Sequence, residues 1–196
     1  MSKKGFNLFI TNIRRIYSCY TFSFFELLAV KSKFFDRILT DTRKPYFTNE
    51  INMAKVASKD RVLHIGCGIH PTHCILIAKL TNAEVVGIDN SKKAVKLARK
   101  YVKKMNLSKL VTIEFACGED YPVDKFDIIF VAINVFPIDD VLKNLSKKLK
   151  KGTRILCKSI KSDITDLVEK QGFSKDFEIV ESCDNPVTKS YLLMKK

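Results

Sequence analysis

A turn with two glycines, followed by an acidic residue at the end of the next apolar run, carries the clearest chemical signal in the sequence. Gly66 and Gly68 follow one apolar run, and Asp89 closes the next one. Two glycines let a ligand approach the backbone, and the helix start after them offers unpaired N–H donors. A carboxylate at the second position can accept both ribose hydroxyls of an adenosine-containing ligand. The pattern therefore predicts a site for a nucleoside-type cofactor.

The spacing within this motif narrows the choice of cofactor. The dinucleotide fingerprint requires a third glycine, which would fall near His70 or Pro71 and is missing. A pyrophosphate site is therefore disfavoured. S-adenosylmethionine (SAM) has a small amino-acid end instead of a pyrophosphate and fits the motif better. The alternative to any cofactor site is a plain structural turn.

The elements that would position this motif alternate regularly along the chain. Apolar runs predict strands at 62–65, 84–88, 111–115, 126–132 and 153–158. Helices are predicted at 71–80, after Ser91 as a cap, at 138–149 and at 164–171, and residues 177–194 form a closing hairpin. This order predicts an α/β protein with a doubly wound, mostly parallel sheet of seven strands, whose ligands bind at the carboxyl ends of the strands.

That rule selects further candidates for the cofactor site. Cys67 lies in the glycine turn, and Asn90 follows Asp89. Glu119 follows the third strand, where its carboxylate could accept from an adenine amino group, although an acidic loop in water explains it equally well. Ala132 and Asn134 follow the fourth strand, where an acceptor substrate would also lie. These residues complete the predicted binding set.

The N-terminal region differs in composition from the rest of the chain. Eleven of the 20 aromatic residues fall in the first 47 positions, so this segment must pack on something. Helices are predicted at 5–20 and 22–39, followed by a polar segment at 43–50 and a short helix at 51–57. We interpret residues 1–57 as a helical cap over a cofactor-binding domain at 58–196. A partner or a membrane surface is the alternative, although Glu26 and Asp36 interrupt the basic face.

The amino-acid composition limits which binding partners and which cellular compartment are expected. The chain has 35 basic and 21 acidic residues, and such an excess of positive charge is typical of proteins that bind nucleic acid. Most of the lysines lie opposite apolar stripes, as in ordinary solvent-exposed helices. A small-molecule acceptor is therefore favoured over nucleic acid. A nucleic-acid partner and a homodimer are the alternatives. Six scattered cysteines and the lack of an apolar run of membrane-spanning length indicate the cytoplasm. The three histidines, at 64, 70 and 73, fit no standard zinc spacing, so no metal is expected.

The order of strands and motifs from Val62 to Lys196 resembles the SAM-dependent methyltransferase superfamily, with its Rossmann-like fold and reversed final hairpin. The resemblance implies that Gly66 and Gly68 line the methionine part of SAM, that Asp89 binds the ribose and that Glu119 binds the adenine. Two departures are His64, where an acid is usual, and His70-Pro71 in place of the third glycine. No Asn-Pro-Pro-Tyr motif follows the fourth strand, which disfavours amine methylation of nucleic acid.

A narrower resemblance is to the nicotianamine synthases. Their G-S-G-P-L-P turn is similar to the segment from Gly66 to Pro71, and their Pro-Tyr-Tyr-x-Asn segment is similar to residues 45–49. Those enzymes transfer the 3-amino-3-carboxypropyl group of SAM and release methylthioadenosine. The resemblance implies that Tyr46 lies beside the sulfonium and that Glu26 accepts a proton from the attacking amine. His70 and His73 are alternative bases.

Three functions are compatible with these residues. The first is aminocarboxypropyl transfer from SAM to an amine. The second is methyl transfer from SAM to a small molecule or to RNA. The third is a SAM-binding domain without catalysis, which the histidines at irregular motif positions would explain.

Overall fold

The structure, a computed structural model, describes residues 20–159, 163–170, 172–186 and 188–196. These residues form a seven-stranded sheet with the strand order β3-β2-β1-β4-β5-β7-β6. The strands are β1 (Arg61–Ile65), β2 (Glu84–Asp89), β3 (Val111–Phe115), β4 (Ile128–Val131), β5 (Arg154–Ser159), β6 (Phe177–Asp184) and β7 (Lys189–Lys195). Strands β1 to β5 run parallel, and β7 pairs antiparallel with both β5 and β6. The predicted doubly wound sheet and its reversed hairpin are confirmed.

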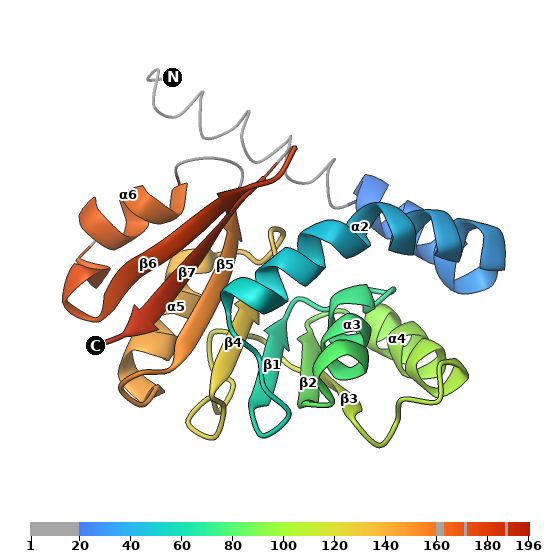
Figure 1. Ribbon diagram of the computed structural model, residues 1–196, viewed down its shortest axis with the longest axis horizontal. Coiled ribbons are helices and arrows are strands. Elements are labelled where there is room, and N and C mark those ends of the chain that lie inside the picture. The colour runs from blue at the N-terminus through green and yellow to red at the C-terminus, as the bar shows by residue number, and fades with distance from the viewer. Residues whose placement is uncertain (1–19, 160–162, 171, 187) are drawn as a thin grey trace.

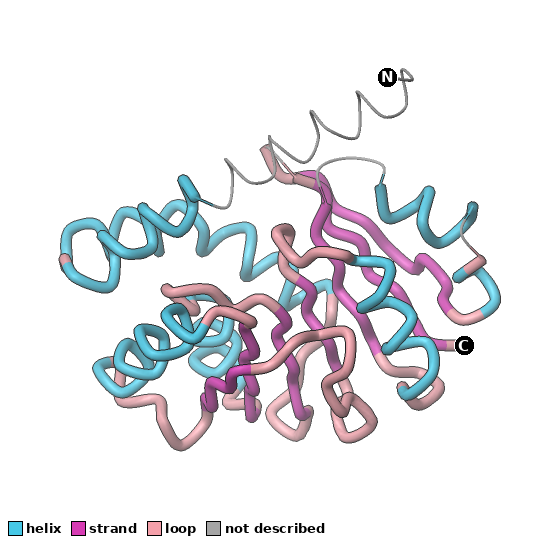
Figure 2. Tube along the Cα trace, turned by 180° about the vertical axis from the view of Figure 1, so that it is seen from behind, coloured by secondary structure: helices cyan, strands magenta, loops and turns pink. Residues whose placement is uncertain are grey.

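Helices cover both faces of this sheet. They are α3 (Thr72–Thr81), α4 (Lys92–Lys104), α5 (Ile138–Lys148) and α6 (Asp163–Lys170), with a short 3-10 turn at Phe173–Lys175. Helices α3 and α4 lie in front of the sheet in Figure 1, and α5 and α6 lie on the opposite face, which is seen in Figure 2. Each face has its own apolar core, and β1 supplies both because its side chains alternate: Val62 packs with α3 and α4, while Leu63 and Ile65 pack with α5 and α6.

Residues that are close together in the sequence determine where several of these elements begin and which face they bury. The Ser91 hydroxyl accepts from the backbone N–H of Ala94 at 3.2 Å, so the predicted cap of α4 is confirmed. This helix buries Val95, Ala98 and Val102 and exposes its lysines. The fourth strand is shorter than predicted, Ile128–Val131 instead of 126–132.

The helical cap is built differently from the prediction. Residues 20–31 are helical, Ser32 interrupts, and α2 then runs without a break from Lys33 to Met53 with Pro45 inside it. The predicted helix end at residue 39, the polar segment at 43–50 and the separate helix at 51–57 are therefore wrong. A proline costs an interior helix about 3 kcal/mol. Burial of the apolar side chains of Ile51 and Met53 at the end of α2 offsets this cost.

The cap lies across the carboxyl edge of the sheet, so that α2 passes over the ends of the central strands (Figure 1). The helix predicted at 5–20 falls, except for its last residue, outside the described residues. None of the helices in the described part of the chain has the length and apolar character needed to cross a membrane.

Candidate active site

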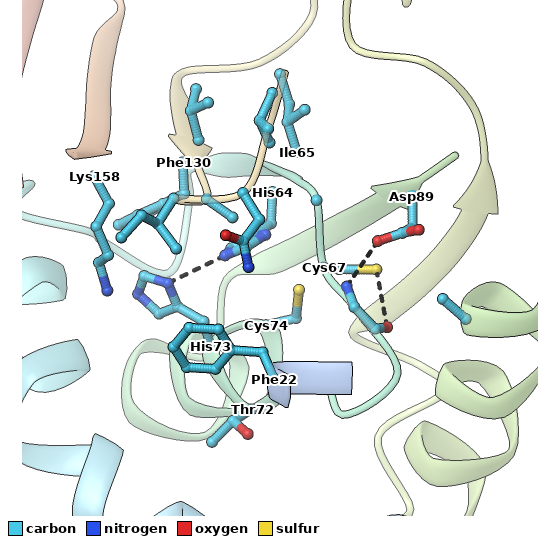
Figure 3. A pocket seen from close by; sticks show the side chains of 18 of the residues that line it. Phe22, His64, Ile65, Cys67, Thr72, His73, Cys74, Asp89, Phe130 and Lys158 are labelled. Atoms are coloured by element: carbon cyan, nitrogen blue, oxygen red, sulfur yellow. Dashed lines mark hydrogen bonds between the residues drawn. The ribbon is translucent and has the colours of Figure 1, made fainter. Parts of the chain in front are cut away.

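A cavity of about 760 Å³ lies where the cap meets the carboxyl ends of the strands. Every residue predicted for the site lines this cavity: Glu26, Tyr46, Gly66, Cys67, Gly68, Asp89, Asn90, Glu119, Ala132 and Asn134. Figure 3 shows Asp89 on one side of the cavity and Lys158 on the other, with His64 and His73 between them. The structure thus gathers the predicted residues in one place, and their individual roles stay predictions.

The glycine turn is shaped as a close-approach loop. Gly66 and Gly68 have φ angles of +79° and +71°, a region that side chains rarely adopt. A Cβ at Gly66 would lie 2.8 Å from Val135 Cγ2, and one at Gly68 would lie 2.7 Å from Glu26 Oε2. The N–H groups of Gly66 and Cys67 donate to the Ile88 carbonyl at 2.8 and 3.0 Å, which fixes the turn against β2. The backbone angle therefore favours glycine at both positions, and at Gly68 a side chain would also have to displace the Glu26 carboxylate.

Asp89 is held in place at the end of β2. Its Oδ2 accepts from the N–H of Gly68 and its Oδ1 from the N–H of Ser91, both at 2.9 Å. Each carboxylate oxygen keeps a further acceptor position. Asp89 can therefore accept ribose hydroxyls while it ties the glycine turn to β2, and the site fits the adenosine part of SAM.

The other predicted binding residues differ in how they face the cavity. Cys67 is buried in the core, and burial raises the pKa of its thiol well above the ordinary value, which disfavours the thiolate form. Ala132 donates its N–H to the Ile65 carbonyl at 3.0 Å. Glu119 and Asn90 are exposed at the cavity rim, and Asn134 is half-buried.

Glu26 reaches the glycine turn from the cap. Its Oε2 accepts from the N–H of Ile69 at 3.0 Å, and Arg43 Nη1 donates to its Oε1 at 3.1 Å. Burial raises the pKa of this carboxyl, although Arg43 and the backbone donors oppose that shift. A carboxylate of raised pKa is a better proton acceptor near neutral pH.

The alternative base His70 is occupied by structural contacts. Its Nε2 lies 2.9 Å from Asp36 Oδ1, and its Nδ1 is bonded to the Thr72 hydroxyl. Asp36 also accepts from the Tyr101 hydroxyl, so it joins the cap to α4. Asp36, which the sequence suggested would interrupt a basic outer face, instead points inward.

Helix α2 presents one stripe to the cavity. Arg43, Tyr46, Phe47 and Glu50 follow the spacing of one helix face, and all four line the cavity. Tyr46 is 37% exposed. The predicted break at 43–50 would have separated these residues, whereas the continuous helix aligns them.

Glu50 and Lys158 are site residues that the sequence reasoning missed. Glu50 is 0% exposed, and its Oε1 accepts from Lys158 Nζ at 2.8 Å and from Ser190 Oγ at 2.7 Å. A signal for Lys158 was present, because it lies near the carboxyl end of a buried strand, where ligands bind. Glu50 had no such signal, since its partners are more than 100 residues away in the sequence.

Comparison with known families agrees with this geometry. The model of a family described as "Methyltransferase domain" matches residues 57–190. The chain belongs to this methyltransferase family. It is accordingly a transferase that uses SAM. A search of curated proteins found no significant match.

Solved structures show the same fold. An RNA methyltransferase from Salinibacter ruber in complex with S-adenosyl-L-homocysteine is 19% identical, with a TM-score of 0.64 over 78% of this chain and 91% of that one. MtNAS in complex with MTA and tNA is 18% identical, with a TM-score of 0.71 over 88% of this chain and 69% of that one. TrmN from Thermus thermophilus is 16% identical, with a TM-score of 0.63 over 76% of this chain and 48% of that one.

Proposed function

We propose that this protein transfers the 3-amino-3-carboxypropyl group of SAM to an amine, as its resemblance to the nicotianamine synthases implies. One observation carries the proposal: the helical cap brings Glu26 and Tyr46 into the same cavity as the glycine turn and Asp89. Neither residue belongs to the sheet domain. Their position supports a reaction that uses the cap as well as the SAM-binding turn.

The structural similarity to MtNAS extends into the cap. Residues 1–57 make up more than a quarter of the chain, so the match to MtNAS over 88% of it must include part of the cap. By the same arithmetic, the match to the Salinibacter ruber RNA methyltransferase over 78% of the chain also includes part of the cap, although a smaller part. Low identity limits both likenesses to the fold, and the choice of transferred group rests on the site residues.

The residues of the cavity suit the parts of this reaction. Gly66 and Gly68 would hold the methionine part of SAM, Asp89 the ribose and Glu119 the adenine. When bound, SAM supplies carbons that its sulfonium makes electrophilic. Glu26, held by Arg43 and the N–H of Ile69, would accept the proton that the amine loses as its nitrogen bonds to the aminocarboxypropyl carbon, the bond from that carbon to sulfur breaks and methylthioadenosine leaves. Tyr46 would lie beside the sulfonium, and the binding geometry decides which carbon faces the amine.

Methyl transfer to a small molecule or to RNA is the second candidate. The family match and the net charge of +14 favour it. An RNA substrate would add phosphate contacts, so its binding would weaken steeply as salt rises.

The released nucleoside distinguishes these reactions. Purified protein is incubated with SAM alone and then with SAM and a small-molecule cell extract, and the products are identified by mass spectrometry. Methylthioadenosine formed above the spontaneous breakdown of SAM, and dependent on the extract, is the expected result. S-adenosylhomocysteine would instead establish methyl transfer and would remove Glu26 and Tyr46 from their proposed roles.

A further inference from the structure

The cavity extends beyond the predicted SAM-binding residues to a buried polar group, the Glu50 cluster, formed by Glu50, His64, His73 and Lys158. His64 Nε2 and His73 Nδ1 are 3.2 Å apart and share a hydrogen bond. Three buried atoms in the cluster have no hydrogen-bond partner: Glu50 Oε2, His64 Nδ1 and His73 Nε2. An unpaired buried polar atom is costly, and three of them in residues that line one cavity leave donor and acceptor capacity for a water or a polar ligand.

The electrostatics of the Glu50 cluster limit the kind of ligand. Burial lowers the pKa of His64 to about 3 and that of His73 well below its usual value, and Lys158 lowers both further. Both rings are therefore neutral at pH 7. The charge of Lys158 offsets that of Glu50, to which it donates at 2.8 Å. The cluster as a whole carries no net charge, which suits an uncharged polar ligand.

The walls of the cluster are aromatic. Phe47 stacks on the His73 ring with centroids 4.3 Å apart, and the Phe130 ring meets His73 edge-on at 4.6 Å. Lys158 Nζ lies 4.4 Å from the centroid of the Phe47 ring, so its charge is satisfied by Glu50 and by this ring. An apolar chain bearing one polar head group would suit such a pocket.

We propose that the Glu50 cluster binds the amino group of the acceptor substrate, with N–H donors to Glu50 Oε2 and His73 Nε2. These two acceptors lie 3.7 Å apart, and one nitrogen placed between them can donate to both. This arrangement requires His73 to donate its Nδ1 proton to His64 Nε2. The uncharged cluster favours the neutral form of this amino group, which is distinct from the amine that loses its proton to Glu26. The identification of this amine as an acceptor substrate rests on the proposed function. Binding of an amine to the Glu50 cluster can be tested independently of that function.

The three histidines of the chain make the test direct, because all of them line the cavity. Their ring nitrogens are followed by ¹⁵N NMR while the full chain is titrated with n-butylamine at alkaline pH. The signals of His64 and His73 are expected to shift, and those of His70, held by Asp36 and Thr72, to stay unchanged. Sodium pentanoate, with a similar chain and a carboxylate head, is expected to cause no shift.

Glu50→Gln tests the acceptor atom itself while keeping the shape of the side chain. We expect the affinity for n-butylamine to fall at least about tenfold, because an amide N–H replaces one acceptor oxygen. SAM affinity, measured by calorimetry, should change by less than about twofold, because Glu50 has no contact with the glycine turn or Asp89 among its hydrogen bonds. Glu84→Gln, at an exposed position, is the matched control.

The outcomes separate this inference from the proposed function. Wild-type His64 and His73 signals that do not respond to the amine, that respond equally to pentanoate, or that still respond in Glu50→Gln would overturn the amine site. Such a result would leave the identity of the transferred group untouched. Conversely, release of S-adenosylhomocysteine would overturn aminocarboxypropyl transfer without affecting the titration.

Discussion

Two glutamates from the helical cap, the half-buried Glu26 and the fully buried Glu50, line the same cavity but differ in what their oxygens contact. Both oxygens of Glu26 are engaged, one by Arg43 and the other by the N–H of Ile69. Glu50 has one oxygen bound by Lys158 and Ser190, while its Oε2 has no hydrogen-bond partner. Glu26 is thus fixed against the SAM-binding turn, whereas Glu50 keeps one acceptor oxygen without a hydrogen bond. The difference suggests separate tasks, with proton acceptance at Glu26 and acceptor binding at Glu50.

The largest effect is expected from Asp89→Ala, which tests the SAM-binding residues shared by every version of the proposal. The change removes the candidate ribose acceptor and also the contacts to the N–H groups of Gly68 and Ser91. SAM affinity, measured by calorimetry, should fall by about 100-fold, as for the loss of two charge-assisted hydrogen bonds. Asp124→Ala, at an exposed position outside the cavity, is the control. Unchanged affinity in Asp89→Ala would remove Asp89 from the SAM site.

Comparison of Glu26→Gln with Glu50→Gln should distinguish the roles of the two glutamates. Loss of a general base lowers the rate by about 100-fold or more, while SAM affinity should fall by less than about tenfold. We expect Glu50→Gln to raise the KM for the amine instead, with a smaller effect on kcat. Steady-state kinetics with both substrates make the comparison. Equal changes in kcat and KM for both variants would contradict separate tasks.

The pH dependence offers a second test of Glu26. Burial raises its pKa above the ordinary 4.5, and the carboxylate form is the one that accepts a proton. Activity should therefore fall as the pH drops through that raised value, and this acidic limb of the kcat profile should be absent in Glu26→Gln. A limb that persists in the variant would assign the titration to another group.

His64 links the Glu50 cluster to acid stability. Burial lowers the pKa of His64 to about 3 in the folded protein, whereas the unfolded chain has the ordinary value of 6.5. Between pH 6.5 and pH 3, His64 therefore gains a proton only in the unfolded chain. Stability should therefore fall as the pH drops below 6.5, by about 1.4 kcal/mol per pH unit for this group. His64→Gln should show a shallower loss in urea unfolding measured from pH 7 to pH 5. An equal slope in both proteins would contradict the burial argument.

The smallest effect is expected at the junction of cap and domain. Asp36 accepts from the Tyr101 hydroxyl and contacts His70, which joins α2 to α4 and to the glycine turn. Asp36→Asn should lower the free energy of unfolding by about 1–2 kcal/mol, with the exposed change Asp41→Asn as control. A double-mutant cycle with Tyr101→Phe should show that the two losses are coupled, and additive losses would contradict a direct bond.

Local chemistry explains why much of the fold could be predicted. The glycine turn, the cap at Ser91 and the alternation of apolar strands each depend on residues a few positions apart. Periodicity alone also placed the third strand, Val111–Phe115, with its observed bounds. The predicted cofactor-binding residues followed from the glycine turn and from the rule about the ends of parallel strands, whereas Glu26 and Tyr46 followed from the resemblance to the nicotianamine synthases. The structure gathers all of them in one cavity.

The errors and omissions arise where distant residues decide the outcome. Pro45 indicated a break, but packing of the end of α2 against the domain kept the helix continuous. Glu50 is matched by Lys158 and Ser190, which only the finished sheet brings beside it. The inward orientation of Asp36 likewise depends on Tyr101, 65 positions later. No local pattern reports such pairings.

The most direct test of the central claim follows the label of SAM into the acceptor product. SAM carrying ¹³C in its aminocarboxypropyl group is compared with SAM carrying ¹³C in its methyl group, each incubated with the protein and a small-molecule extract. Mass spectrometry should find the aminocarboxypropyl label in a new amine product, with loss of that product in Glu26→Gln. Entry of the methyl label instead would contradict the account and assign methyl transfer to this cavity.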